Sequence, residues 1–129
     1  MLSESDQLLV RAAREAAERA YAPYSMCFTG AAVRSIRELI YVGASLESAS
    51  YGLTLCAEMN ALAAANQAGE YQFLEAIAVV GPKLSLPCGR CRQLILECAQ
   101  ISERDIDVIS CSLDLEQITK AKISSLLPQ

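Results

Sequence analysis

Three cysteines and one glutamate stand at a spacing that can build a catalytic metal site. Cys56 is followed two residues later by Glu58, and Cys88 and Cys91 form a Pro-Cys-x-x-Cys segment further along the chain. Three thiolates can hold Zn²⁺ tetrahedrally with one position left for water, whose pKa the metal lowers to about 7. A carboxylate at Glu58 can take the proton of that water and deliver it to a substrate nitrogen. We therefore expect one Zn²⁺ per subunit, with Glu58 as the acid and base.

The elements around these residues favour the same site. Cys88 and Cys91 stand three apart at the start of an expected helix, which places both sulfur atoms on one face near the positive end of the helix dipole. Cys56 also opens an expected helix, so two helix N-termini can converge on one ion. The sequence contains no histidine, which leaves three sulfur atoms as the ligand set.

The remaining pattern predicts an α/β protein. Apolar periodicity indicates a first helix, capped by Ser5-Asp6 and running to about residue 21, and helices near 56–67 and 88–100. Strands are expected near 28–35, 39–44, 73–80, 106–111 and 113–118, with a last helical turn near 123–127. The first two strands should form an antiparallel hairpin. We expect a three-layer α/β/α sandwich with a mixed five-stranded sheet.

Composition narrows the class of protein. The chain has 129 residues, 53% of them hydrophobic, and a net charge of −4. This length predicts one domain over residues 1–129. The negative charge argues against a nucleic-acid partner, and the absence of a long apolar run or a basic leader argues against a membrane and for a cytoplasmic protein. In a reducing compartment the clustered cysteines favour metal binding over disulfides.

Other interpretations of the cysteines remain open at this point. Cys88 and Cys91 alone are compatible with a structural zinc knuckle or a redox pair, and a zinc-binding scaffold without turnover is a further class. A four-sulfur structural site would need Cys27, Cys98 or Cys111, none of which has paired spacing. Glu58 argues against a structural site, because such a site has no use for an acid and base group.

The Cys-Ala-Glu and Pro-Cys-x-x-Cys motifs resemble those of the zinc-dependent nucleoside deaminases, and more narrowly the small homotetrameric cytidine deaminases. The likeness covers nearly the whole chain and includes Ala-Pro-Tyr-Ser at 22–25, Glu-Ser-Ala-Ser-Tyr-Gly at 47–52 and Leu-Leu-Pro at 126–128. It implies a cytidine deaminase-like fold, a homotetramer and a small-molecule nucleoside substrate. The implied reaction is hydrolysis of cytidine and 2'-deoxycytidine to uridine and 2'-deoxyuridine with release of ammonia, a step of pyrimidine salvage.

The resemblance also implies substrate contacts. An acidic residue at the position of Glu47 binds ribose hydroxyls in that family, and a carboxylate can accept two hydrogen bonds from a vicinal diol. Ser45 stands where the family has Asn, and Cys27 where it has a Phe that packs on the pyrimidine. Phe28 follows one residue later, which on a strand points it to the other face unless a bulge shifts the register. The expected substrate-binding set is Glu47, Ser45, Ala57, Tyr51, Phe28 and Cys27.

Two departures from the family concern charge and substrate. Met59 replaces the arginine that hydrogen-bonds the zinc thiolates, so we expect Arg90, with Arg92 nearby, to act as replacement donors around the metal.

The same pattern resembles blasticidin S deaminases, which makes a deaminase of blasticidin S or another modified cytosine nucleoside the alternative function. Polynucleotide deaminases share the motif but conflict with the negative charge. Related enzymes often continue beyond Leu-Leu-Pro, so we expect substrate closure to come from elsewhere.

Overall fold

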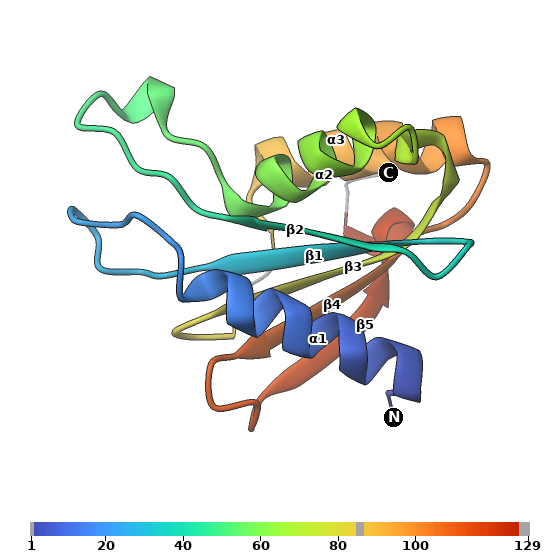
Figure 1. Ribbon diagram of the computed structural model, residues 1–129, viewed down its shortest axis with the longest axis horizontal. Coiled ribbons are helices and arrows are strands. Elements are labelled where there is room, and N and C mark those ends of the chain that lie inside the picture. Colours follow the sequence, from blue (N-terminus) through green and yellow to red (C-terminus); the bar gives the residue numbers. More distant parts are fainter. Residues whose placement is uncertain (1, 85–86, 127–129) are drawn as a thin grey trace.

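The computed structural model describes residues 2–84 and 87–126. Figure 1 shows a central sheet with helices on both of its faces. The helices are α1 (Glu4–Ala17), α2 (Ala57–Gln67) and α3 (Gly89–Ser102), and the short 3₁₀ turns are η1 (Tyr51–Leu53), η2 (Tyr71–Phe73) and η3 (Ile123–Leu126). The strands are β1 (Gly30–Ser35), β2 (Ile40–Ala44), β3 (Leu74–Gly81), β4 (Asp107–Ser112) and β5 (Ile118–Lys122).

The sheet has five strands in the order β2-β1-β3-β4-β5. β1 runs antiparallel to both β2 and β3, β3 and β4 are parallel, and β4 and β5 are antiparallel. The expected hairpin of the first two strands is therefore confirmed, with Gly30 opposite Ala44 and Arg34 opposite Ile40. A mixed five-stranded sheet was also predicted correctly.

The two faces of the sheet are covered by different helices. Ile77 and Val79 of β3 face a core shared with α2 and α3, whereas Ala78 and Val80 face a core shared with α1. β3 is consequently buried along almost its whole length, as expected for a central strand covered on both faces. The predicted three-layer α/β/α arrangement is confirmed.

Two glycines set how closely the helices approach the sheet. A Cβ atom added to Gly43 of β2 would lie 2.3 Å from the backbone nitrogen of Ala61 in α2. A Cβ atom added to Gly30 of β1 would lie 2.0 Å from the carbonyl oxygen of Ala13 in α1. Both helices thus rest directly on strand backbone, and α2, which begins after Cys56, takes its position from Gly43.

The last strand differs from the prediction. The expected strand at 113–118 was wrong, because residues 113–117 form the turn that leads into β5, which begins at Ile118. The Ser112 hydroxyl donates to Asp114 Oδ1 at 2.5 Å and accepts from the Gln117 N–H at 3.1 Å. Leu115 has a φ of 61°, a left-handed conformation that no regular strand contains. The apolar residues of this turn alternate in the sequence as they would in a strand, but they do not form one.

The first helix also differs at both ends. Ser3 is its N-cap and accepts a hydrogen bond from the Asp6 N–H at 3.1 Å, so the expected Ser5-Asp6 cap was wrong. The helix ends at Ala17 rather than near residue 21, because Tyr21 pairs with Leu46 in a parallel bridge. The expected final helical turn is present as η3 up to Leu126, and Leu127 lies outside the described residues.

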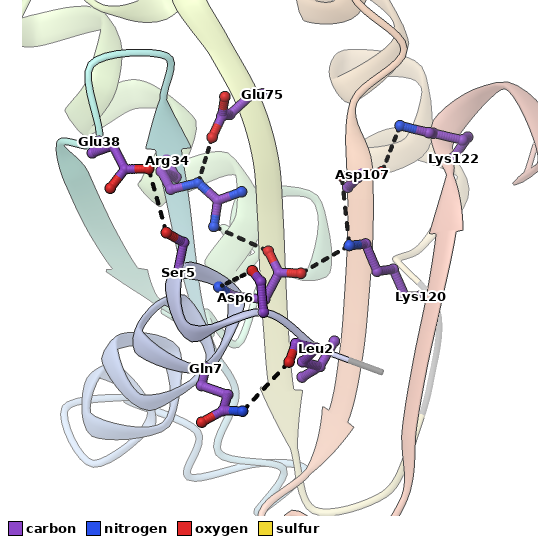
Figure 2. A network of polar contacts seen from close by, with 11 residues as sticks. Leu2, Ser5, Asp6, Gln7, Arg34, Glu38, Glu75, Asp107, Lys120 and Lys122 are labelled. Carbon is purple, nitrogen blue, oxygen red and sulfur yellow. Dashed lines mark hydrogen bonds and ion pairs between the residues drawn. The ribbon is translucent and has the colours of Figure 1, made fainter.

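Asp6 belongs instead to a buried network of charges that joins α1 to the sheet (Figure 2). Its carboxylate lies 3.0 Å from Arg34 Nη1 and 2.8 Å from Lys120 Nζ, and Arg34 Nε lies 2.6 Å from Glu75. Burial opposes ionisation of Asp6, but the hydrogen bonds and charges of Lys120 and Arg34 outweigh it and lower its pKa. The network ties α1, β1, β3 and β5 together at one end of the sheet.

Among the described residues, every helix is too short or too polar to cross a bilayer.

Candidate functional site

The three predicted sulfur atoms lie together. The Sγ atoms of Cys56, Cys88 and Cys91 all lie within 4.8 Å of one another. Cys56 Sγ is 3.8 Å from Cys88 Sγ, which is 3.4 Å from Cys91 Sγ. Zinc–thiolate bonds of about 2.3 Å in a tetrahedral site place sulfur atoms about 3.8 Å apart. The separations and the chemistry of this group therefore fit one Zn²⁺ ion with three protein ligands.

Helix starts present these sulfur atoms. Cys56 is the N-cap of α2 and Cys88 is the N-cap of α3, while Cys91 lies in the first turn of α3. A side chain at an N-cap normally accepts a hydrogen bond from the helix backbone. Neither Cys56 nor Cys88 makes such a bond, so both sulfur atoms remain available to a metal. The positive ends of two helix dipoles favour negative charge at this point.

The pKa values of Cys56, Cys91 and Glu58 are shifted by their contacts with one another and by burial. The hydrogen bond with Cys91 lowers the pKa of Cys56 to about 6, and Cys88 and the positive charge of Arg90 act in the same direction. The same sulfur contact and burial raise the pKa of Cys91. Glu58, only 5% exposed, has its pKa raised by burial and further by the neighbouring Cys56 thiolate. Both effects favour the protonated carboxyl group, which suits a residue that acts in turn as base and as acid.

A short backbone bridge connects the sulfur group to Glu47. Leu46 and Leu55 exchange two backbone hydrogen bonds, of 2.9 Å and 2.8 Å, in an antiparallel bridge. Leu46 precedes Glu47 and Leu55 precedes Cys56, so the bridge fixes the predicted sugar-binding residue relative to a sulfur ligand. The Tyr21 carbonyl accepts the Glu47 N–H at 2.9 Å on the other side.

Glu47 itself contacts the loop around Ser25. One carboxylate oxygen accepts the backbone N–H groups of Tyr24 and Ser25, each at 3.1 Å, and the other accepts the Ser25 hydroxyl. The Ser25 hydroxyl and backbone bonds lower the pKa of Glu47, which keeps this carboxylate ionised. Figure 1 shows the 18–29 and 45–56 loops projecting from the end of the molecule where α2 and α3 begin.

The other expected substrate contacts are dispersed. Ser45 and Ala57 flank the bridge, with Ser45 half-buried and its hydroxyl 3.4 Å from the Thr29 N–H. Cys27 is exposed in the loop that contacts Glu47, and Tyr51 begins η1. Phe28 lines a hollow with residues of α1, including Ala17, and with Leu113. Since α1 covers the face opposite to α2 and α3, the structure does not bring Phe28 to the sulfur group.

The two arginines of α3 differ in their surroundings. Arg90 is exposed and its Nη2 lies 3.5 Å from Met59 Sδ on α2, so it spans the gap between the two helices beside the sulfur atoms. Arg92 donates to the carbonyl oxygens of Pro87 at 2.7 Å and Leu126 at 3.0 Å. Arg92 therefore holds the segment before Cys88, and Arg90 is the arginine whose charge reaches the thiols.

Two residues of this region were missed from the sequence. Asn60 Nδ2 donates to the Ala44 carbonyl at 2.6 Å and ties α2 to the end of β2, just before Ser45. Ser25 supplies two of the three hydrogen bonds to Glu47. Sequence spacing carries no signal for either contact, because the partners are 16 and 22 residues apart and on different elements.

Comparison with known proteins agrees with this geometry. Residues 3–104 match the family model described as "Cytidine and deoxycytidylate deaminase zinc-binding region". The cytidine deaminase of Halalkalibacterium halodurans is 38% identical over 125 residues, which are 95% of this chain and 90% of that protein. The cytidine deaminase of Sporosarcina psychrophila is 37% identical over 119 residues, 89% of this chain and 85% of that one.

Solved structures show the same fold. The crystal structure of cytidine deaminase from Burkholderia pseudomallei superposes with a TM-score of 0.87 at 34% identity, covering 99% of this chain and 98% of that one. The cytidine deaminase from Mycobacterium tuberculosis gives a TM-score of 0.78 at 33% identity, covering 95% and 94% of the two chains. The family model, which matches most of the chain, and these relatives show that the chain belongs to the cytidine deaminase family of zinc-binding hydrolases that act on C–N bonds.

Proposed function

We propose that this protein catalyses the hydrolytic deamination of cytidine and 2'-deoxycytidine to uridine and 2'-deoxyuridine, as one catalytic domain over residues 1–129. The observation that carries the proposal is the convergence of the Cys56, Cys88 and Cys91 sulfur atoms within 4.8 Å of one another beside the buried Glu58. These three residues would hold one Zn²⁺ per subunit. When bound, zinc supplies a Lewis acid that makes water a competent nucleophile at neutral pH.

Glu58 carries the proton transfers of the reaction. Its carboxylate accepts a proton from the attacking water and delivers it to N3 of the cytosine ring as the water oxygen adds at C4. The Glu58 carboxylate then takes the remaining proton from the hydroxyl group added at C4 and passes it to the exocyclic amine. The C4–N bond breaks, a C4 carbonyl forms and ammonia leaves. Burial and the Cys56 thiolate raise its pKa, which supports a residue that alternates between acid and base.

The sugar and the base meet different parts of the site. Glu47, fixed through the Leu46–Leu55 bridge, is the proposed acceptor for a sugar hydroxyl, and Ser45 lies beside it. Ala57 at the start of α2, with Cys27 and Tyr51, is proposed to contact the nucleoside. Phe28 is not proposed to contact the nucleoside bound by the same chain, because it lies against α1.

Arg90 is the proposed compensating charge for the metal site. Three thiolates and one Zn²⁺ leave a net charge of −1, and a cation nearby offsets it. Met59 occupies the position after Glu58 and has no charge, whereas the Arg90 guanidinium reaches across to Met59 from α3. Arg92 supports the same segment through Pro87.

A homotetrameric, cytoplasmic salvage enzyme completes the proposal. Large exposed apolar side chains gather on the two projecting loops, which supports burial against further copies of the chain. They are Tyr21, Tyr24, Met26, Phe28, Leu46, Leu53 and Leu55. The mass of the protein in solution, measured by light scattering, tests the tetramer.

A substrate panel tests the proposed reaction. Purified zinc-loaded protein is given cytidine, 2'-deoxycytidine, cytosine, adenosine and blasticidin S, and kcat/KM is followed from the absorbance change as the amine is replaced. We expect the two cytosine nucleosides to be the best substrates. The relatives described above are named cytidine deaminases, which does not favour the blasticidin S alternative. Preference for blasticidin S, or no turnover of either nucleoside, would contradict the proposal.

A further inference from the structure

The backbone on both sides of the Cys88 Cα atom is held by one side chain and its own N–H group. Pro87 is buried and, as a proline, has no N–H, so its carbonyl is the only backbone group that it can hydrogen-bond. That carbonyl accepts Arg92 Nε at 2.7 Å. The Arg92 backbone N–H donates to the Cys88 carbonyl at 2.8 Å where the helix begins. Arg92 therefore fixes the carbonyls immediately before and at this sulfur ligand.

The same guanidinium is bound to the C-terminal turn of the chain. Arg92 Nη1 donates at 3.0 Å to the carbonyl oxygen of Leu126, at the end of η3. A guanidinium is planar and rigid, and its N–H groups point in fixed directions. The position of the Leu126 oxygen consequently restricts the direction in which the Nε donor can point toward Pro87.

The turn η3 is itself fixed to the body of the protein. Ile123 is 1% exposed within the core that α3 shares with the sheet, and its N–H donates to the Ile106 carbonyl at 2.9 Å. The Asp105 carboxylate accepts the Ser124 N–H at 3.1 Å and the Ser124 hydroxyl at 2.6 Å. Hydrogen bonds thus run from Asp105 through η3 and Arg92 to the segment that carries a sulfur ligand.

We infer that Arg92 is a positioning residue that couples the C-terminal turn η3 to the Cys88 ligand of the metal site. Without the bond to Leu126, the long side chain of Arg92 is free to change its torsions, and the Pro87 carbonyl loses a donor of fixed direction. Metal sites require ligand positions to within about 0.2 Å, so the loss should weaken zinc binding. This inference rests on the metal site of the proposed function, and it gives Arg92 a role that depends on geometry and not on charge.

Two substitutions of Arg92 separate geometry from charge. Arg92→Lys keeps the positive charge, but a single ammonium group cannot reproduce two donors held in a planar fork. We measure zinc affinity by competition with a chromogenic chelator. We expect Arg92→Lys to lower zinc affinity by about tenfold, nearly as much as Arg92→Ala, as is typical when the support of a metal ligand is lost. Wild-type zinc affinity in Arg92→Lys would overturn the inference, because the charge alone would then suffice.

A pair of aspartates tests the coupling to η3 with a matched control. Asp105→Ala removes both hydrogen bonds to Ser124. Asp114→Ala removes an equivalent pair in the turn before β5, where Asp114 Oδ1 accepts the Ser112 hydroxyl at 2.5 Å and the Glu116 N–H at 2.9 Å. Both variants should lower the Tm of the metal-free protein by similar amounts. Only Asp105→Ala should weaken zinc binding several-fold and release zinc faster to the chelator, and equal zinc affinities in the two variants would overturn the coupling.

A double substitution tests whether η3 acts through Arg92. Asp105→Ala should weaken zinc binding by less than about twofold when it is added to Arg92→Lys, because effects that share one path are not additive. The full several-fold loss in that background would overturn the inference. If the Arg92 variants do not fold, the comparison of Asp105→Ala with Asp114→Ala decides. A folded wild-type protein that binds no zinc would overturn the proposed metal site, whereas wild-type zinc affinity in all variants would overturn only this inference.

Discussion

Gly43→Ala should disturb the metal site by displacing α2, the helix that begins after Cys56. The added Cβ would lie 2.3 Å from Ala61 N, 2.7 Å from the carbonyl carbon of Asn60 and 2.8 Å from the Ala57 oxygen. All three atoms belong to the backbone of α2, so no side-chain rotation relieves the clash. Non-bonded heavy atoms settle roughly 3.5 Å apart, so the helix must retreat by about 1 Å. Cys56 and Glu58 would move with it.

The size of the effect follows from two separate terms. Overpacking of this kind costs about 1–3 kcal/mol, which for a domain of this size lowers Tm by roughly 4–12 °C. Zinc sites tolerate ligand displacements of only about 0.2 Å, so a retreat of α2 relative to α3 should weaken zinc binding by at least about tenfold. The expected result is therefore a loss of metal affinity beyond the loss of stability.

Two other glycines supply the matched controls. Gly30→Ala creates a similar clash on the other face of the sheet, 2.0 Å from Ala13 O in α1, which carries no sulfur ligand. Gly52→Ala meets nothing within 4 Å. We expect Gly30→Ala to lower Tm but leave zinc affinity near the wild-type value, and Gly52→Ala to change neither. Tm is measured by calorimetry and zinc affinity by competition with a chromogenic chelator. Equal zinc affinities in Gly43→Ala and Gly30→Ala would refute the reasoning.

Three further predictions concern metal binding and pH. Cys91→Ala should lose zinc, and one equivalent of zinc by elemental analysis would reject Cys91 as a ligand. Arg90→Ala should weaken zinc binding by about tenfold while the Tm of the metal-free protein stays unchanged; an unaltered affinity in the chelator assay would remove its proposed role. Asp6→Asn should cost about 3 kcal/mol at neutral pH in urea unfolding, because it disrupts the buried ion pair with Arg34. The lowered pKa of Asp6 means that its stabilisation is present above about pH 4 and is lost as the pH falls through the folded value, so the variant should show a shallower acid loss of stability. An identical pH slope in both proteins would contradict this.

The part of the site that local spacing controls was predictable from the sequence. Cys56, Cys88 and Cys91 stand at helix starts that short-range patterns reveal, and the structure brings their sulfur atoms together. The layers of the fold followed from apolar periodicity in the same way. The contact between Glu47 and Ser25 could not be predicted in this way, because Ser25 lies in a loop 22 residues away in the chain.

The misplaced fifth strand has a comparable physical reason. Leu113 and Leu115 alternate as a strand would, but Leu115 is left-handed and the Ser112 hydroxyl closes a turn around it. Side-chain hydrogen bonds of this kind compete with regular structure and leave no periodic signal. Phe28 likewise could not be assigned to a face from its position alone, because the strand begins only at Gly30.

The central claim is that Glu58 performs the proton transfers of a hydrolysis at a three-sulfur zinc site. The most direct measurement is kcat for cytidine with Glu58→Gln, on samples whose zinc content is determined at the same time. The side chains are nearly equal in size, so the account predicts that one equivalent of zinc is retained while kcat falls by about 10²-fold or more. A variant that holds one equivalent of zinc and turns cytidine over near the wild-type rate would contradict the account.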